Sequence, residues 1–436
     1  MIKRLYSDDE GFKRQLDQLL AIDNSEELQV RKVVASILAD IQQRGDAAIL
    51  EYTAKFDDLS PASVSELEVP DHRLKQAYID LDPLVKEALE SSAERVRSYH
   101  EKQKQALGGG KNWTYTDADG NELGQLIRGM SRVGIYTPGG KAAYPSTVLM
   151  TAIPARVAGV GEITLMVSTP GGQVSEVVLA AAYLAGVDRV YTIGGAQAIG
   201  ALAYGTGTIH RVDKIVGPGN IYVTTAKAMV FGDVGIDMLA GPSEIAIVAD
   251  DSANIDWLVM DMFAQAEHDE MAQAILISTD GDLLDEIEAS LRDTIENMER
   301  KNIIEQSLAR RGALIKVDHL EGAAEIINRI APEHLEIALV RPEQLLDLVQ
   351  HAGAVFIGNH SAEVVGDYMA GPSHVLPTGG TARFGSPLGV YDFQVRSSII
   401  KCSARGSVKL SRNSAILAKE EGLHAHAESA KYRVQG

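Results

Sequence analysis

The sequence has almost no cysteine, and this limits the kinds of site it can hold. Cys402 is the single cysteine in 436 residues. An internal disulfide and a thiolate metal cluster are therefore excluded, and the composition fits a reducing compartment such as the cytoplasm. Any metal ion in this protein would have to be held by histidine and carboxylate groups.

Long hydrophobic runs and an excess of positive charge are also missing. No apolar stretch approaches the roughly 20 residues that span a bilayer, and the basic pair Lys3-Arg4 has no apolar core behind it. We therefore expect neither a membrane segment nor a secretory signal. The formal net charge of −19 predicts no nucleic-acid partner, because binding phosphates requires a basic face. With 45% hydrophobic residues, the chain is expected to form two or more soluble domains.

Helical periodicity dominates residues 1 to about 109. Apolar residues recur at helical spacing in 25–52 and again in 71–105. Pro83 falls inside the second stretch, which predicts two helices with the later one starting near this proline. We expect His100, on the charged side of that stretch, to be exposed.

From about residue 131 the pattern changes to alternating strand and helix. The expected strands are 132–136, 162–168, 189–193, 214–216, 244–249, 274–278 and 354–358. Three of them end in a Gly-containing loop that opens a helix, a pattern that builds parallel sheets with ligands at the carboxyl ends of the strands. The two similar units, 136–241 and 242–376, predict a duplicated sheet with a cleft between. The loops lack a strict dinucleotide fingerprint, so phosphate binding and simple tight turns both stay open.

Two further elements lie outside this alternation. The Asp119-Gly120 dipeptide between two strand-like runs, 113–116 and 123–127, predicts a β-hairpin. A last helix is expected over 413–430, and it carries three polar residues: Glu421, His424 and His426.

One predicted helix carries half of a possible metal site. Apolar residues from Ile255 to Ala266 form a helical stripe, and Asp261, Gln265 and His268 lie beside it at spacings of four and three. An amide oxygen and an imidazole nitrogen therefore point the same way. Taken alone the pair is a weak signal, because glutamine is an uncommon ligand and a histidine on a helix face is usually a half-buried polar residue.

A candidate acid–base pair follows later in the chain. Pro332 suits the first position of a helical turn, so Glu333 and His334 are expected at its start, where they could act as general base and proton relay. A favourable first-turn acid beside a surface histidine is the alternative. A later loop carries four more polar residues: Glu363, Asp367, Ser373 and His374.

Eight strings, taken together, closely resemble the histidinol dehydrogenase family. In chain order they are GIYTPGGKAAYPSTVLM, GGAQAIGALAYGT, KIVGPGN, AGPSE, QAEH, APEHLE, VGDYMAGPSH and EGLHAHAES. They keep the family's order between residues 134 and 429. Ser373 departs from the family's more usual asparagine.

The resemblance implies an enzyme that oxidises L-histidinol to L-histidine in two NAD-dependent steps through L-histidinal, the last step of histidine biosynthesis. It implies one zinc ion per subunit, held by Gln265, His268, Asp367 and His426. The catalytic pair falls on Glu333 and His334, and the NAD contacts on Tyr136, Gln197 and Asn220. Substrate contacts fall on Ser243, His334 and Glu421 together with the zinc ligands.

The resemblance also implies an α/β fold with two incomplete Rossmann-like parallel-sheet units, a helical N-terminal region and a small C-terminal helical domain. Residues 30–135 with 242–388 would form the catalytic domain, and 136–241 the NAD-binding domain. Residues 1–29 with 389–413 would form a dimerisation segment, and 414–436 would complete the active site of the partner in a homodimer.

Two other functions stay open. One is a sibling dehydrogenase acting on another small polar alcohol, such as a sulfonated diol. The other is a regulatory protein that keeps the nucleotide cleft without the chemistry. The intact Glu333-His334 pair and the four metal positions speak against the second.

Overall fold

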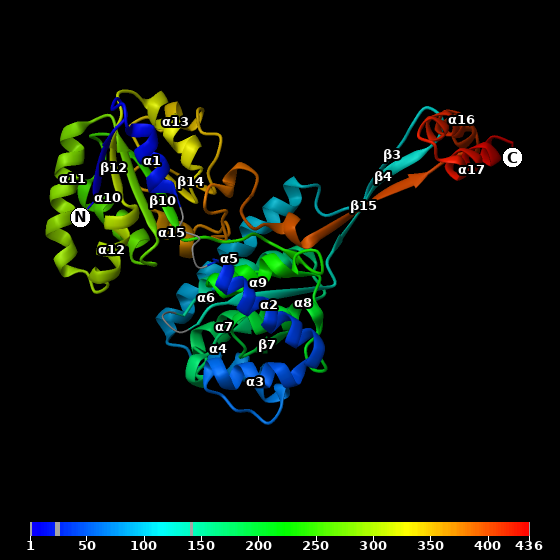
Figure 1. Ribbon diagram of the computed structural model, residues 1–436, viewed down its shortest axis with the longest axis horizontal. Coiled ribbons are helices and arrows are strands. Elements are labelled where there is room, and N and C mark those ends of the chain that lie inside the picture. The colour runs from blue at the N-terminus through cyan, green and yellow to red at the C-terminus, as the bar shows by residue number, and fades with distance from the viewer. Residues whose placement is uncertain (1, 22–26, 140–142, 436) are drawn as a thin grey trace.

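The computed structural model describes residues 2–21, 27–139 and 143–435. Figure 1 shows two helix-covered sheets side by side and a slender arm that carries the C-terminal helices away from them. The fold thus has three parts: two sheets that helices enclose and an arm that extends away from them.

Sheet A consists of six parallel strands. Their spatial order is β1 (Lys3–Tyr6), β12 (Ala313–Lys316), β11 (Gln273–Ser278), β10 (Glu244–Ala249), β13 (His334–Ala338) and β14 (Ala354–Ile357). Helices α10 (Ile255–Ala266), α11 (Gly281–Thr294) and α12 (Lys301–Arg311) cover one face, and α1 (Phe12–Leu20) and α13 (Leu320–Ile330) cover the other. The central strands are therefore buried on both faces, which explains their continuous apolar sequence.

Sheet B also has six strands. Their order is β2 (Glu68–Val69), β7 (Arg189–Tyr191), β6 (Glu162–Val167), β5 (Arg132–Thr137), β8 (Lys214–Val216) and β9 (Gly235–Ile236). Only β2 runs antiparallel to its neighbour. One face packs on α4 (Asp71–Ile79), α5 (Pro83–Ala106), α6 (Pro145–Ala158) and α7 (Glu176–Ala185), and the other on α2 (Glu27–Arg44), α3 (Asp46–Asp57), α8 (Gly195–Tyr204) and α9 (Ile221–Val230).

The two sheets share one topology, which confirms the predicted duplication. In each, the chain lays down three strands in one direction and then returns to the other side of the first strand: β10, β11 and β12, then β13 and β14 in sheet A; β5, β6 and β7, then β8 and β9 in sheet B. Such a switch point leaves a crevice beside the first strand. In sheet A the catalytic candidates lie where β13 begins, beside β10, and in sheet B the predicted NAD residue Tyr136 lies on β5 itself.

The arm is built on a third, antiparallel sheet. Strands β3 (Trp113–Thr116) and β4 (Glu122–Gly129) form the predicted hairpin, and β15 (Gln394–Lys401) pairs along the whole of β4. The predicted last helix over 413–430 was wrong in its bounds. Two helices, α16 (Ala404–Glu420) and α17 (His424–Gln435), are separated at Gly422, whose φ of +75° ends the first.

The N-terminal region differs from its expected form in three ways. It contributes the edge strands β1 and β2, which the helical periodicity of their surroundings concealed. The stretch expected as one helix is divided at Gly45, with a φ of +55°, while Pro83 begins α5 as predicted. His100 is fully buried rather than exposed, and its Nδ1 lies 2.8 Å from the Val96 carbonyl oxygen.

Residues 27–106 pack against sheet B. Helix α2 contacts α8 and α9, while α4 and α5 contact α7 and α6. Helix α5 also contacts the other unit, since Ser92 and Arg95 donate to the carbonyl oxygens of Tyr368 and Met369. The predicted domain boundaries, residues 30–135 with 242–388 among them, stay predictions.

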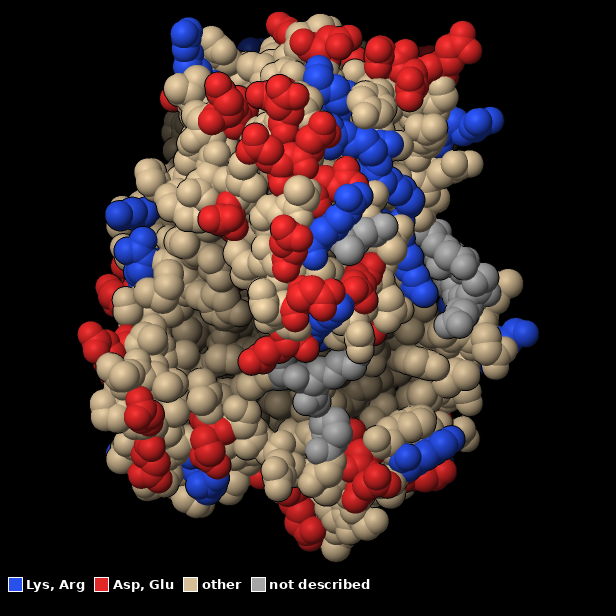
Figure 2. Space-filling model, turned by 90° about the vertical axis from the view of Figure 1, so that its left-hand side faces the viewer, with Lys and Arg blue, Asp and Glu red and all other residues tan. Residues whose placement is uncertain are grey.

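The surface carries mixed charge. Figure 2 shows acidic side chains spread over one end of the molecule, gathered most densely towards its upper part, with basic side chains between them. Among the described residues, no helix is both long and apolar enough to cross a membrane.

The loop after β8 gives a first testable prediction. Gly217 has a φ of +111°, and a Cβ there would lie 2.1 Å from the Tyr136 carbonyl oxygen. Gly232 has the same φ with nothing within 4 Å. We expect Gly232→Ala to lower the free energy of unfolding by about 1 kcal/mol, the backbone cost alone, and Gly217→Ala by at least about 2 kcal/mol. Urea unfolding measures both, and equal losses would contradict a close approach to Tyr136.

Candidate active site and metal centre

The catalytic candidates Glu333 and His334 lie where β13 begins. His334 is the first residue of this strand and pairs with Ile245 on one side and Ala354 on the other. The predicted helical turn was therefore wrong. Pro332 cannot donate a backbone hydrogen bond, and such a residue is tolerated just before a strand as well as at a helix start. Parallel neighbours on both sides decide in favour of the strand.

His334 is held in one tautomer by two acceptors. Its Nδ1 lies 3.1 Å from the Glu244 carbonyl oxygen and 3.1 Å from Oε1 of Gln265. Because both partners accept, the network assigns the proton to Nδ1 and leaves Nε2 free. Burial lowers the pKa of His334 to about 4, so the ring is neutral at pH 7. A neutral, oriented imidazole with a free Nε2 can accept a proton.

Glu333 lies beside this ring and is 7% exposed. Its Oε2 accepts the Glu244 backbone N–H at 3.0 Å and lies 3.8 Å from Nδ1 of His334. Burial raises the pKa of Glu333 well above its usual range. A carboxylate with a raised pKa is a stronger base than one in water.

Three potential metal ligands gather next to the pair. His268, Glu363 and Asp367 each offer a ligand atom, and these atoms lie within 4.8 Å of one another. His268 follows α10, whereas Glu363 and Asp367 are four residues apart on α15 (Glu363–Tyr368) and so share one helix face. Oε1 of Glu363 is also 3.7 Å from Nε2 of His334. The free nitrogen of the base therefore faces the cluster.

Asp367 is the acid of this cluster that stays ionised. Burial raises its pKa, but the hydrogen bond to His374 and the nearby histidines lower it more, so the net shift is downward. The His374 ring also reaches Thr147 of α6, with Nε2 at 3.2 Å from Oγ1. Ser92 of α5 donates to the Tyr368 carbonyl oxygen at 2.6 Å. Contacts from the helices of sheet B thus hold the cluster against sheet A.

The chemistry of these donors fits zinc. Gln265 is fully buried, and its Nε2 has no hydrogen-bond partner among the described residues; Oε1 of Glu363 has none either. A buried carboxylate oxygen without a partner, such as Oε1 of Glu363, is available to a cation, and Gln265 would bind one through its amide oxygen. Imidazole nitrogen combined with carboxylate or amide oxygen is a donor set that suits zinc, and also manganese or cobalt.

Most of the predicted metal and substrate residues come together, but two do not. Gln265, His268 and Asp367 surround His334, and the partly exposed Ser243 directly precedes β10. Glu421 and His426 are exposed and lie with α16 and α17 at the tip of the arm, far from α10 and α15 (Figure 1). Within one chain the four predicted zinc ligands do not meet.

Glu363 and His374 were not assigned to the site from the sequence. The spacing of four residues between Glu363 and Asp367, after an apolar strand, was the available signal for the first. His374 gave no such signal, because it reaches the site from an irregular segment whose path depends on its contact with α6.

The predicted NAD residues lie at the carboxyl edge of sheet B, as the strand–loop–helix pattern suggested. Tyr136 is buried, and its hydroxyl accepts the Gly195 N–H at 3.1 Å. Gln197, also buried, lies in the first turn of α8. Asn220 is exposed and caps α9 by accepting the N–H groups of Tyr222 and Val223. Gly140 of the first loop lies outside the described residues.

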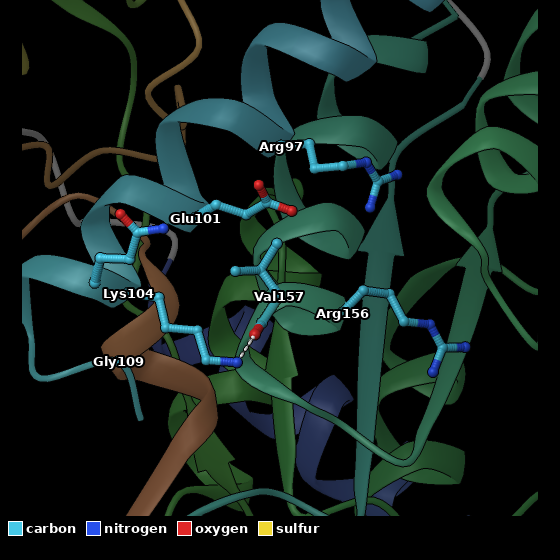
Figure 3. Close-up of a pocket in the computed structure, with 7 residues that line it drawn as sticks. Arg97, Glu101, Lys104, Gly109, Arg156 and Val157 are labelled. Atoms are coloured by element: carbon cyan, nitrogen blue, oxygen red, sulfur yellow. Dashed lines mark hydrogen bonds between the residues drawn. The ribbon is translucent and has the colours of Figure 1, made fainter. Parts of the chain in front are cut away.

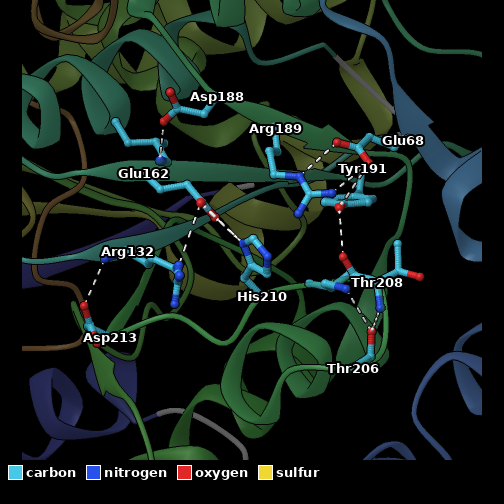
Figure 4. Close-up of polar contacts among 12 residues, drawn as sticks. Glu68, Arg132, Glu162, Asp188, Arg189, Tyr191, Thr206, Thr208, His210 and Asp213 are labelled. Carbon is cyan, nitrogen blue, oxygen red and sulfur yellow. Dashed lines mark hydrogen bonds and ion pairs between the residues drawn. The ribbon is translucent and has the colours of Figure 1, made fainter.

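The opposite, amino edge of sheet B is closed by ion pairs (Figure 4). Arg189 binds Glu68 at 2.9 Å, and Glu162 lies 3.0 Å from Nδ1 of His210 and 3.7 Å from Arg132. The two sheets therefore use opposite edges. Sheet A carries the catalytic pair at its amino edge, and sheet B carries the predicted NAD loops at its carboxyl edge.

A hollow of about 310 Å³ lies away from these residues, between α5 and α6. Figure 3 shows its lining, in which Lys104 donates to the Val157 carbonyl oxygen at 2.6 Å. Arg156 donates to the Gly186 carbonyl oxygen. Because these two cations already donate to backbone oxygens, we interpret the hollow as a packing gap between the two helices.

Comparisons with known proteins agree with the eight strings quoted above. A family model described as histidinol dehydrogenase matches residues 21–434. The histidinol dehydrogenase of Pseudomonas savastanoi pv. phaseolicola is 56% identical over 433 residues, 99% of this chain and 96% of that protein. The one of Nitrosospira multiformis is 57% identical over 432 residues, 99% and 97%. A crystal structure of histidinol dehydrogenase from Elizabethkingia anophelis is similar, with a TM-score of 0.91 and 32% identity, over 100% of this chain and 98% of that one.

Behind the metal cluster, Glu336 gives a prediction about pH. Burial, together with the charge of Asp261, raises the pKa of Glu336 to about 8, whereas its ordinary value is 4.5. Between about pH 4.5 and 8, Glu336 is protonated in the folded protein and ionised in the unfolded one, so unfolding releases a proton. The free energy of unfolding therefore falls as the pH rises through this range. Glu336→Gln keeps an acceptor for the Glu363 N–H. In this variant the free energy of unfolding should fall less between the two pH values, by on the order of 2–4 kcal/mol.

Urea unfolding at several pH values between 5 and 8 measures the effect. Glu325→Gln, at an exposed position on α13, is the matched control and should leave the slope unchanged. An unchanged slope in Glu336→Gln would show that this carboxyl is already ionised in the folded protein.

Proposed function

The chain belongs to the histidinol dehydrogenase family and is an oxidoreductase, and from this premise we propose that it oxidises L-histidinol to L-histidine through L-histidinal. Two NAD molecules accept the hydrides, and the reaction completes histidine biosynthesis. The observation that carries this proposal is the buried Glu333-His334 pair facing the cluster of His268, Glu363 and Asp367.

His334 is the base in both oxidations. Each oxidation removes a proton from an O–H group and a hydride from the carbon that bears it. Nε2 of His334 carries no proton and faces the cluster, so it can take the O–H proton. Glu333, whose pKa burial raises, activates the water that adds to the aldehyde. Once His334 has released the first proton to solvent, its Nε2 can accept the O–H proton of the hydrate.

One zinc ion per subunit fits the cluster, with Gln265, His268, Asp367 and the partner's His426 as its ligands. When bound, zinc supplies a fixed positive charge that orients a substrate with an amine and an imidazole. Oε1 of Gln265 already accepts from His334, and its second lone pair stays available. Ser243 and Glu421 complete the substrate contacts, and Glu421 offers a negative charge to the amine.

NAD would bind at the carboxyl edge of sheet B through Tyr136, Gln197 and Asn220. The N-terminus of α8 opens there, and a helix N-terminus favours phosphate, while Asn220 already caps the N-terminus of α9. Helix α6 begins at the same edge and touches His374 through Thr147. This contact places the cluster next to the carboxyl edge of sheet B, which supports direct hydride transfer from a substrate carbon at the cluster to a nicotinamide bound at that edge.

We further propose a homodimer in which the C-terminal residues 414–436 complete the partner's site, with 1–29 and 389–413 as dimerisation segments. Two exposed apolar surfaces support this. Helices α16 and α17 with their connection expose Leu410, Ile416, Leu417, Leu423 and Tyr432. The face beside the metal cluster exposes Trp257, Met260, Val364, Val365 and Tyr368. Unpaired apolar surfaces of this kind favour association.

The sibling activity on another polar alcohol gains no support from Ser373. Its hydroxyl donates to the Met150 carbonyl oxygen at 3.0 Å and accepts the Val375 N–H, and the residue is 3% exposed. It therefore binds backbone rather than facing the cluster. Location in the cytoplasm is part of the same proposal, supported by an exposed single cysteine and the reducing conditions it suits.

The stoichiometry of NADH formation tests the proposed reaction. Limiting L-histidinol should yield two NADH per molecule consumed, because the site holds both a base and a water activator. Absorbance at 340 nm measures NADH, and a hydrazine trap detects free aldehyde. One NADH per histidinol with trapped aldehyde would limit the chain to the first oxidation.

Complementation between two inactive variants tests the shared site. His268→Ala and His426→Ala should each be nearly inactive as homodimers. After mixed refolding, a heterodimer has one site with both lesions and one intact site, so activity should approach half the wild-type value per heterodimer.

Differential tags purify the heterodimer before the assay. Recovered activity would mean that His426 serves the other chain. If it serves its own chain, every site in the heterodimer has one lesion, and the activity stays at the level of the single variants.

A further inference from the structure

The main chain of Glu244 binds both members of the catalytic pair. Its N–H donates to Oε2 of Glu333 at 3.0 Å, and its carbonyl oxygen accepts from Nδ1 of His334 at 3.1 Å. One peptide segment at the start of β10 thus orients the proposed base and selects the tautomer that leaves Nε2 free. A small rotation of this segment would disturb both residues together.

The side chain of Glu244 fixes that segment from behind. Its Oε1 lies 3.5 Å from Nη2 of Arg311, the last residue of α12, and its Oε2 accepts the Gly379 N–H at 3.1 Å. Glu244 and Arg311 are each 3% exposed. The carboxylate therefore connects the start of β10 to a helix of sheet A and to the irregular segment that follows His374.

Stability alone does not account for this ion pair. Nε and Nη1 of Arg311 are buried and have no hydrogen-bond partner among the described residues. A buried pair that is incompletely hydrogen-bonded is often no more stable than apolar side chains of similar volume. Its presence beside the catalytic pair points to a geometric role.

We propose that Glu244 is a positioning residue: its side chain, through the hydrogen bond from Gly379, holds the main chain of β10 in the orientation that Glu333 and His334 require, while Arg311 compensates its buried charge. The Glu244 side chain does not touch the substrate; it acts through the peptide groups of residue 244. The inference rests on the proposed catalytic roles of Glu333 and His334, and it adds the device that orients them.

Two double variants separate positioning from stability. Glu244→Gln/Arg311→Met removes both charges but keeps an oxygen that can accept the Gly379 N–H. Glu244→Leu/Arg311→Met also removes both charges and loses that acceptor. Neither leaves an unpaired buried charge, so both should fold with a Tm near or above the wild-type value.

The two variants should differ in turnover. We expect the Gln/Met variant to keep kcat within about threefold of wild type, because the main chain stays attached to Gly379. The Leu/Met variant should lose about 10- to 100-fold in kcat, the range for a misplaced catalytic group, with the KM for L-histidinol within about twofold. Arg4→Met, which removes the partly buried ion pair with Asp285 at the edge of the same sheet, should lower Tm and leave kcat unchanged.

Three outcomes would overturn the proposal: wild-type kcat in a folded Leu/Met variant, a kcat that follows Tm across the whole set, or equal losses in the Gln/Met and Leu/Met variants. His334→Asn is assayed in parallel. If His334→Asn is inactive while Leu/Met is not, only the positioning role fails. If His334→Asn keeps full activity, the catalytic assignment fails instead.

Discussion

The pairing of β10 with the start of β13 is the constraint on which the site depends. Parallel strands place Ile245 opposite His334, and this register sets the Glu244 peptide against the Glu333-His334 pair. Both strands are buried by helices on each face, so a shift of one residue would turn every apolar side chain to the wrong layer. The packing of sheet A therefore fixes the geometry of the pair more firmly than a loop could.

The sequence predicted those parts of the fold in which local pattern and tertiary packing agree. The stripe on α10 placed Gln265 correctly, and Pro83 marked the start of a helix, because periodicity and proline chemistry act over a few residues. It failed at His334 because a residue after proline suits a strand start as well as a helix. That choice was made by strands β10 and β14, which lie far away in the chain. The burial of His100 under residues near 388 had the same non-local origin.

Topology alone would place the sites of both sheets at the same edge, and the polar and charged residues indicate otherwise. The rule for parallel sheets predicts ligands at the carboxyl edge, and sheet B follows it with its glycine loops and helix N-termini. On sheet A the proposed chemistry occupies the amino edge, where His268 at the end of α10 returns beside the start of β13. In sheet B the matching edge is closed by ion pairs such as Arg189–Glu68. The same architecture therefore serves two different roles.

The charge balance of the site favours the binding of a cation. Burial raises the pKa of Glu333, Glu336 and Glu363, so in this environment ionising these carboxyls is unfavourable. Positive charge brought into the cluster reverses that preference, since each ionised acid then has a partner. A divalent metal and an ammonium-bearing substrate both supply such charge. Binding either one would lower the acids' pKa values, release protons and stabilise the folded state, so occupancy, proton release and stability are linked in this site.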